Sequence, residues 1–321
     1  MFSLRYRDRD GFPLMFNRLP PGVLPPGGFG IYAGGFDGGS NYATPDKANF
    51  ITETTGAVAG YNLSLARRAL SACGNSAFGI FAGGFTVSYV ATADKANYVT
   101  ETTAASSGYD LSSNIQGQAS CGNSSFGIFA GGQTPSYVLT ADKANYLTET
   151  TGAAAGYNLS LARAFLSACG NSDFCIFAGG FNGSYYVTAD KANFITETTG
   201  AAAGYNLSLA RTRLSACGNS AFGIFAGGLD PSYYATADKA NFITETTGAA
   251  AGYNLSLARS SSSACGNSAF GIFAGGLTGS YVATADKANY VTETTAASSG
   301  YDLSSNRGFL AAASPSTPGS F

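Results

Sequence analysis

Carboxylates and lysines recur at a fixed spacing along this chain of 321 residues, and they are the side chains best suited to acid–base chemistry. The chain has no histidine, so the commonest general base and the Ser-His-Asp and Cys-His arrangements are absent. A catalytic pair of carboxylates needs two groups in different environments, whereas identical copies favour a structural ladder or a solvated face. We therefore expect no enzyme, no cofactor and no metal site. The repeated carboxylates, in which a lysine follows each aspartate, are Asp46, Asp94, Asp142, Asp190, Asp238 and Asp286, with Glu53, Glu101, Glu149, Glu197, Glu245 and Glu293.

The cysteines follow the same spacing. Five of them lie 48 residues apart in the phrase ACGNS or SCGNS, and Cys175 stands alone where other repeats have glycine. An odd number of equivalent positions makes a poor plan for disulfides. We predict that the repeated cysteines are buried, reduced thiols that pack as small hydrophobic side chains, and we assign no role to Cys175. The repeated cysteines are Cys73, Cys121, Cys169, Cys217 and Cys265.

A Gly-Gly pair closes the phrase AFGIFAGG and its variants in every repeat. It begins at Gly34, Gly83, Gly131, Gly179, Gly227 and Gly275, in steps of 49, 48, 48, 48 and 48 residues. Such a period indicates one supersecondary unit copied along the chain. Within residues 67–111, the runs 69–73, 78–82 and 89–98 precede a Thr-Glu-Thr-Thr segment and a small-residue run. Short β-rich runs between turn residues predict about four antiparallel strands per unit, which is one propeller blade.

These features together resemble the kelch repeat. A kelch blade has an apolar strand that ends in a double glycine, a variable loop, a strand with an aromatic residue, and an arginine before the next innermost strand. The chain matches with FAGG, ADKANYVTETT and LSLAR over residues 28–313, although it lacks the kelch tryptophan. The sequences of the motifs and their 48-residue spacing also resemble the kelch-like repeats in tail and appendage proteins of bacterial viruses, especially those of cyanobacteria. The arginines in the match are Arg67, Arg163, Arg211 and Arg259.

The two ends of the repeat region complement each other. The first unit begins at the Gly-Gly strand, residues 29–35, and lacks the apolar strand that precedes it elsewhere. Residues 307–313, RGFLAAA, supply that strand at the correct spacing. A propeller closes its ring in this way and hides both strand edges. We predict an all-β, six-bladed, kelch-like β-propeller over residues 28–313, followed by a tail, 314–321.

Residues 1–27 differ from the repeats in composition. They hold five of the ten prolines, four arginines and several aromatic residues. An extended, proline-rich arm suits docking on a partner, because it has little chain entropy left to lose. A leader without a fixed structure is the other interpretation. The residues predicted to dock are Arg5, Tyr6, Arg7, Arg9, Phe12, Phe16 and Arg18.

The segment between Gly-Gly and Asp-Lys is the most variable part of the unit. Variable loops on a rigid scaffold carry recognition more often than the scaffold does. A tyrosine beside each loop could stack on a sugar or pack on a protein, or it could simply cover a blade edge. The candidate ligand-binding residues are Tyr42, Tyr89, Tyr137, Tyr185, Tyr233 and Tyr281.

The net charge and the hydropathy of the chain exclude some classes of binding partner and of membrane attachment. The net charge is −2 and 11% of residues are charged, so nucleic acid is not expected. No apolar stretch approaches the roughly 20 residues that span a bilayer. Charged residues near the start interrupt the apolar core that a Sec signal needs.

Two functions remain. The first is a non-enzymatic virion component of a phage tail or appendage, docked through residues 1–27 on other assembly proteins. The second is a glycan- or protein-binding module, lectin-like or adaptor-like, that uses the variable loops and is cytoplasmic or exported without a Sec signal. A host surface would be a further partner in either case.

Overall fold

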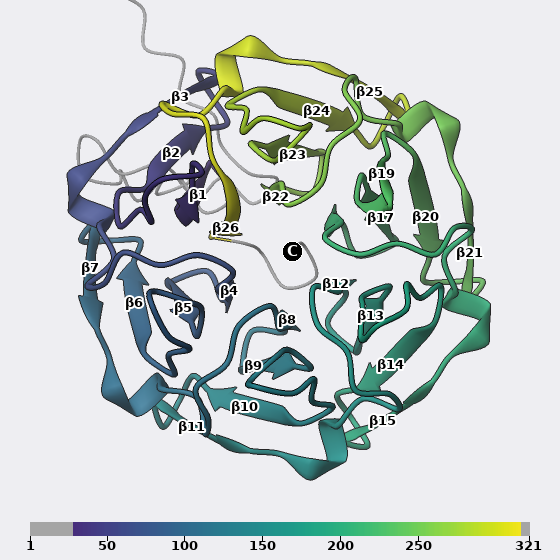
Figure 1. Ribbon diagram of the computed structural model, residues 1–321, viewed down its shortest axis with the longest axis horizontal. Helices are drawn as coiled ribbons and strands as arrows, with labels where there is room; N and C mark the ends of the chain where they lie inside the picture. The colour runs from purple at the N-terminus through teal and green to yellow at the C-terminus, as the bar shows by residue number, and fades with distance from the viewer. Residues whose placement is uncertain (1–27, 316–321) are drawn as a thin grey trace, which may run out of the picture.

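Six four-stranded antiparallel sheets stand around a central axis in the computed structural model, which describes residues 28–315 (Figure 1). Each sheet is one blade of a β-propeller, and the prediction of a six-bladed all-β fold is confirmed. From the axis outwards, blade 1 consists of β26 (Gly308–Ala313), β1 (Phe29–Phe36), β2 (Asp46–Asn49) and β3 (Thr54–Ala57). Blade 2 consists of β4 (Ser71–Gly74), β5 (Phe78–Ala82), β6 (Ala93–Asn97) and β7 (Thr102–Ala105). Blade 3 consists of β8 (Ala119–Gly122), β9 (Phe126–Ala130), β10 (Ala141–Asn145) and β11 (Thr150–Ala153).

The other three blades repeat this order, and blade 5 carries one additional short hairpin in its loop. Blade 4 consists of β12 (Ser167–Gly170), β13 (Phe174–Ala178), β14 (Ala189–Asn193) and β15 (Thr198–Ala201). Blade 5 consists of β16 (Ser215–Gly218), β17 (Phe222–Ala226), β20 (Ala237–Asn241) and β21 (Thr246–Ala249), with the hairpin β18 (Leu229–Asp230) and β19 (Ser232–Tyr233). Blade 6 consists of β22 (Ser263–Gly266), β23 (Phe270–Ala274), β24 (Ala285–Asn289) and β25 (Thr294–Ala297). A three-residue 3-10 helix follows each outermost strand: η1 (Ala59–Tyr61), η2 (Ser107–Tyr109), η3 (Ala155–Tyr157), η4 (Ala203–Tyr205), η5 (Ala251–Tyr253) and η6 (Ser299–Tyr301).

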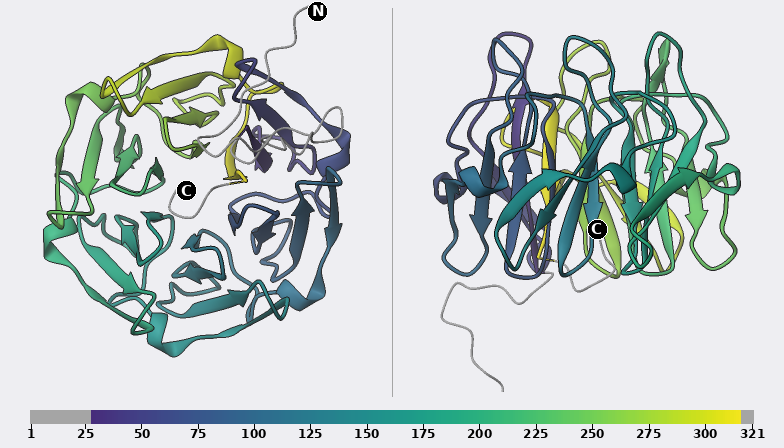
Figure 2. Two further views of the ribbon diagram at one scale, coloured as in Figure 1. Left: turned by 180° about the vertical axis from the view of Figure 1, so that it is seen from behind. Right: turned by 90° about the horizontal axis from the view of Figure 1, so that it is seen from below.

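The expected strand over residues 89–98 is shorter in the structure. Strand β6 covers only its second half, because residues 89–92 belong to the loop that folds back over the Gly-Gly pair. The backbone N–H of Val90 donates to the carbonyl of Gly84, and that of Gly83 donates to Thr92. The two glycines have φ values of 67° and 115°, a region that favours glycine. This turn sends every variable loop out from the same face, which we call the loop face (Figure 2).

Blade 1 joins the two ends of the repeat region. Strand β26 pairs with β1 from Phe36 opposite Gly308 to Ile31 opposite Ala313. The predicted closure of the ring by the last strand is therefore confirmed.

Hydrophobic cores lie between neighbouring blades. Strand β5 is buried along its whole length, whereas the outermost strand β7 is mostly exposed. One core joins Ile80 and Tyr109 of blade 2 to Phe129 and Tyr146 of blade 3, and the same arrangement recurs around the ring. Because each blade buries its apolar faces only against its neighbours, the ring must close before all of them are covered.

The repeated aspartate and lysine have separate structural roles, since consecutive strand residues point to opposite faces of a sheet. The aspartates are buried, whereas each lysine binds the repeated glutamate of the next blade. Lys47 Nζ lies 2.5 Å from Glu101 Oε1, and Lys287 to Glu53 completes the circle. Such partly exposed pairs each contribute about 0.2–1 kcal/mol. Together they form a structural ladder between blades, as the repetition indicates. The other pairs are Lys95–Glu149, Lys143–Glu197, Lys191–Glu245 and Lys239–Glu293.

Four of the five repeated cysteines face a glycine in the second strand of the next blade. A Cβ at Gly127, for example, would overlap the sulfur of Cys73. Four thiols are buried and free, as predicted: Cys73, Cys169, Cys217 and Cys265. The prediction of a reduced thiol is wrong for Cys121. Cys175 occupies the position of the glycine that the sulfur of Cys121 would otherwise face. The two form a disulfide between blades 3 and 4, with Cα atoms 6.3 Å apart.

We expect thiol labelling to distinguish these two classes of cysteine. Burial raises the pKa of Cys73, Cys217 and Cys265 to about 12, so little reactive thiolate forms near neutral pH. The folded protein should therefore react with none of its four free thiols. In denaturant without reductant those four should react, and prior reduction should add Cys121 and Cys175. Labelling counted by intact mass tests this, and reaction of all cysteines without reductant would contradict the disulfide.

Candidate functional site

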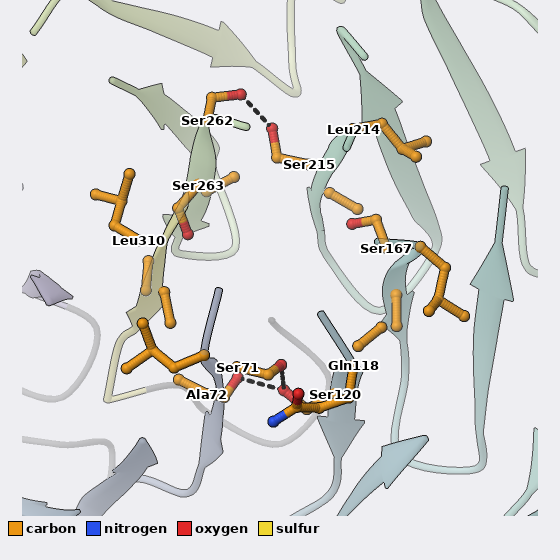
Figure 3. Close-up of a pocket in the computed structure, with 18 residues that line it drawn as sticks. Ser71, Ala72, Gln118, Ser120, Ser167, Leu214, Ser215, Ser262, Ser263 and Leu310 are labelled. Atoms are coloured by element: carbon orange, nitrogen blue, oxygen red, sulfur yellow. Dashed lines mark hydrogen bonds between the residues drawn. The ribbon is translucent and has the colours of Figure 1, made fainter. Parts of the chain in front are cut away.

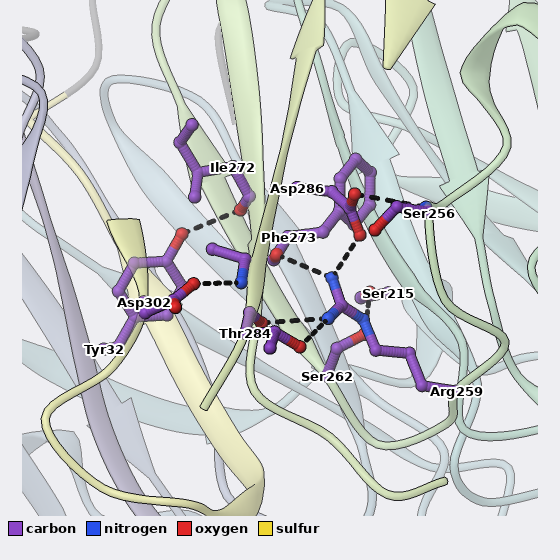
Figure 4. A network of polar contacts seen from close by, with 11 residues as sticks. Tyr32, Ser215, Ser256, Arg259, Ser262, Ile272, Phe273, Thr284, Asp286 and Asp302 are labelled. Carbon is purple, nitrogen blue, oxygen red and sulfur yellow. Dashed lines mark hydrogen bonds and ion pairs between the residues drawn. The ribbon is translucent and has the colours of Figure 1, made fainter. Parts of the chain in front are cut away.

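In five of the six blades, a buried arginine–aspartate pair stands where the innermost strand begins. In blade 6, Arg259 donates to Asp286 Oδ2 at 2.7 Å and to the carbonyl of Phe273 at 3.0 Å (Figure 4). The guanidinium also donates to Thr284, while Asp286 Oδ1 accepts from the backbone N–H of Ser256. Burial lowers the pKa of Arg259 and the nearby Asp286 opposes that shift. These contacts make the pair a structural joint rather than an acid–base site. The equivalent pairs are Arg67–Asp94, Arg163–Asp190, Arg211–Asp238 and Arg307–Asp46.

Blade 3 lacks this pair. Ile115 occupies the arginine position, and Asp142 keeps a buried carboxylate without a cationic partner among the described residues. Its Oδ2 accepts a weak bond of 3.3 Å from the N–H of Ser112, while Oδ1 has no hydrogen-bond partner there. Asp142 is thus the exception in an otherwise uniform series.

The axial channel runs between the innermost strands of the six blades (Figure 3). Its main cavity is about 130 Å³ and is lined by Leu, Ser and Ala side chains together with Gln118. Serine hydroxyls pair across neighbouring strands, with 2.6 Å between the Oγ atoms of Ser71 and Ser120 and 2.8 Å between those of Ser215 and Ser262. None of the residues within 28–315 that line this cavity has a titratable side chain.

A closed circle of backbone hydrogen bonds surrounds the channel where it opens on the loop face. One residue per blade donates its N–H to the carbonyl of its counterpart in the preceding blade, over 2.6–2.8 Å. All six have φ between 52° and 65°, although only one is glycine. A left-handed non-glycine residue costs about 1–3 kcal/mol and persists where its surroundings fix it. We call this opening the axial mouth; its six residues are Ala69, Gly117, Phe165, Arg213, Ser261 and Phe309.

Arg213 places a cation in the axial mouth. Its guanidinium carbon lies 5.2 Å from the ring centroid of Phe165 and 5.1 Å from that of Phe309. Burial lowers the pKa of Arg213, and nearby tyrosines, chiefly Tyr281, oppose the shift. Among residues 28–315, no carboxylate lies within ion-pair distance of it and no side-chain hydrogen bond engages it.

A depression of about 350 Å³ adjoins Arg213 and extends over blades 3 to 5. Tyr137 and Tyr185 line it, together with Gln116, Gln133 and Phe165. The ring of Tyr137 packs on Phe181 of the next blade at 6.0 Å, and Tyr185 packs on the same ring at 5.1 Å. Two of the predicted tyrosines therefore line one depression and pack on the same phenylalanine ring.

The remaining predicted tyrosines are distributed around the loop face. Tyr89 packs on Phe85 of its own loop, and Tyr281 packs on Phe36 of blade 1. Tyr233 pairs with Leu229 in the β18–β19 hairpin. None of these three lines the depression.

Tyr42 is not structurally equivalent to the other five tyrosines. Asn41 makes the bridge to Phe36 that Tyr89 makes to Phe85. Because the first loop is one residue longer, Tyr42 occupies the position of Val90 and donates its hydroxyl to Asp37 at 2.8 Å. The arm residues Arg5, Tyr6, Arg7, Arg9, Phe12, Phe16 and Arg18 lie outside the described residues.

Sequence reasoning missed Arg213, Phe165 and Phe309. A signal was present, because the three residues after the repeated arginine position vary as strongly as the loops do. They read RAL, QGQ, AFL, TRL, SSS and GFL, starting at residues 68, 116, 164, 212, 260 and 308. Only the fold shows that this second variable segment opens on the same face as the loops.

Comparison with models of protein families and with curated proteins found no match to this chain. The fold is that of a six-bladed propeller, while the kelch resemblance and the resemblance to phage appendage proteins remain predictions from the repeat. No helix within residues 28–315 has the length and apolar character needed to cross a membrane.

Proposed function

We propose that this propeller is a non-enzymatic binding module whose ligand site is the axial mouth with its adjoining depression. One observation carries the proposal: both variable segments of an otherwise uniform repeat meet there. The repeated Arg–Asp pairs lie within single blades and the Lys–Glu pairs connect neighbouring blades, so the residues that hold the ring together are separate from those that vary at the mouth. Loops on such a scaffold are the usual place for recognition, and a hollow with aromatic walls and a few polar groups suits a small ligand.

A glycan array probed with the full chain tests this proposal. Replacing both Tyr137 and Tyr185 with serine should weaken any binding by about tenfold or more, because truncating aromatic anchors costs about 1–2 kcal/mol or more. Leu147→Ser is the control, since Leu147 is 91% exposed in an outer hairpin turn remote from the mouth. Binding that survives the double substitution unchanged would contradict the proposed site.

The second candidate function is a virion component that docks through residues 1–27. It is supported by the resemblance of the repeat motifs to those of phage appendage proteins. The two candidates differ in which part of the chain is needed. Under the virion proposal, deleting residues 1–27 abolishes incorporation into the larger assembly, while the tyrosine substitutions leave incorporation intact. The reverse result favours the binding module.

A further inference from the structure

Arg213 differs from the other arginines at the starts of the innermost strands. Arg67, Arg163, Arg211, Arg259 and Arg307 are each neutralised by a buried aspartate. Arg213 lies two residues after Arg211 and has no such partner within the described residues. It is also the single arginine at its position, where the other blades have Ala, Gly, Phe, Ser and Phe.

The cation is held in place before any ligand arrives. Contacts with the rings of Phe165 and Phe309 attract the guanidinium electrostatically. The left-handed backbone of Arg213, at φ 57°, is tied on both sides by the circle of hydrogen bonds. A fixed guanidinium with free N–H donors suits a carboxylate, which it can bind through two parallel hydrogen bonds.

The walls of the depression add groups that suit a sugar ring. Tyr137 and Tyr185 offer aromatic faces and hydroxyls, and Gln116 and Gln133 offer amide groups. Its volume of about 350 Å³ lies at the lower end of the range for small-molecule sites. A peptide would instead use an open strand edge or a long groove, whereas loops surround this hollow.

We propose that the depression binds a carboxylate-bearing sugar, with the carboxylate on Arg213 and the sugar ring against Tyr137 and Tyr185. This proposal rests on the proposed function and names its ligand class. Among the described residues, Arg213 is the one cation that lines the hollow, which matches the single charge of a sugar acid better than the double charge of a phosphate.

Titration calorimetry of the full chain tests the assignment. The probes are oligosaccharides ending in glucuronate, galacturonate or sialate, each beside a counterpart whose carboxylate is reduced to an alcohol. We expect at least one acidic sugar to bind roughly tenfold or more tightly than its reduced counterpart. Arg213→Ser should remove that preference, and Arg213→Lys should retain part of it, because lysine keeps the charge without the planar fork.

Serine is a suitable replacement because Ser261 adopts the same left-handed conformation in blade 6. Leu147→Ser, at a position that is 91% exposed and remote from the depression, is the matched control and should bind like the unmodified chain. Arg213→Ser and the control should both have the melting temperature of the unmodified chain. A loss of binding in Arg213→Ser then cannot be attributed to a loss of folding.

Three results would overturn the inference. They are equal binding of the acidic and reduced sugars, a preference that survives Arg213→Ser, and tighter Arg213-dependent binding of a polyglutamate peptide than of any sugar. If the array finds a neutral glycan whose binding needs Tyr137 and Tyr185, the sugar-acid assignment fails while the proposed function stands. If nothing on the array depends on those tyrosines, the proposed function itself fails.

Discussion

A chain that ends at Ser304 should lose its cooperative thermal unfolding and aggregate. The deletion removes β26, so the inner edge of β1 loses the partner that runs from Ile31 to Phe36. It also removes Arg307 and leaves the buried Asp46 without its cation. An unpaired strand edge invites association with other chains. Because every core spans two blades, we expect a cost on the order of the whole free energy of unfolding, about 5–15 kcal/mol.

Circular dichroism melting and size-exclusion chromatography measure this result. A chain that ends at Pro315 is the control, because it keeps all of β26 and every described residue. That control should melt and elute as the full chain does. If the chain ending at Ser304 also remained monomeric with an unchanged melting temperature, closure by β26 would not be what stabilises the ring.

Asp190→Asn should destabilise the protein by about 3–5 kcal/mol, whereas Asp142→Asn should change stability by less than about 1 kcal/mol. The first substitution leaves Arg163 as a buried charge without its partner, which is costly. Asp142 has no such cation, and an amide oxygen can still accept the bond from Ser112. The two residues occupy the same position in adjacent blades, so the difference isolates the ion pair.

Urea unfolding of both variants gives the two free energies. An equal loss in the two variants would show that the carboxylate contributes through its shape or local hydrogen bonds rather than through the arginine. Replacing both Arg163 and Asp190 with apolar residues should recover part of the loss, because a well-packed apolar pair avoids the desolvation cost.

The repeat alone determined the architecture. Blade number, four-stranded blades and closure by residues 307–313 follow from a fixed period and from short β-rich runs between turns, and both are local properties of the chain. The burial of the free cysteines was also predictable, because each one occupies the same place in the same apolar strand.

Only the tertiary structure decided which residues meet. Asp190 pairs with Arg163, 27 residues away, and Lys143 pairs with Glu197 of the next blade, although each lysine follows an aspartate in sequence. The disulfide between Cys121 and Cys175 depends on which position of the next blade each sulfur faces. A one-residue insertion in the first loop shifts Tyr42 out of register with the other five tyrosines.

The candidate site was likewise predictable only in part from the sequence. Sequence variation marked the loops after Gly-Gly but gave no reason to join them to the residues that follow the repeated arginine. The two segments are separated in blades 2 to 6 by a strand, a turn and a second strand, and in blade 1 they come from opposite ends of the repeat region. The antiparallel pairing of those strands returns the chain to the face from which it started, which brings Arg213 beside Tyr137 and Tyr185. That convergence is a property of the closed ring, and it is the physical basis for the binding site that we propose.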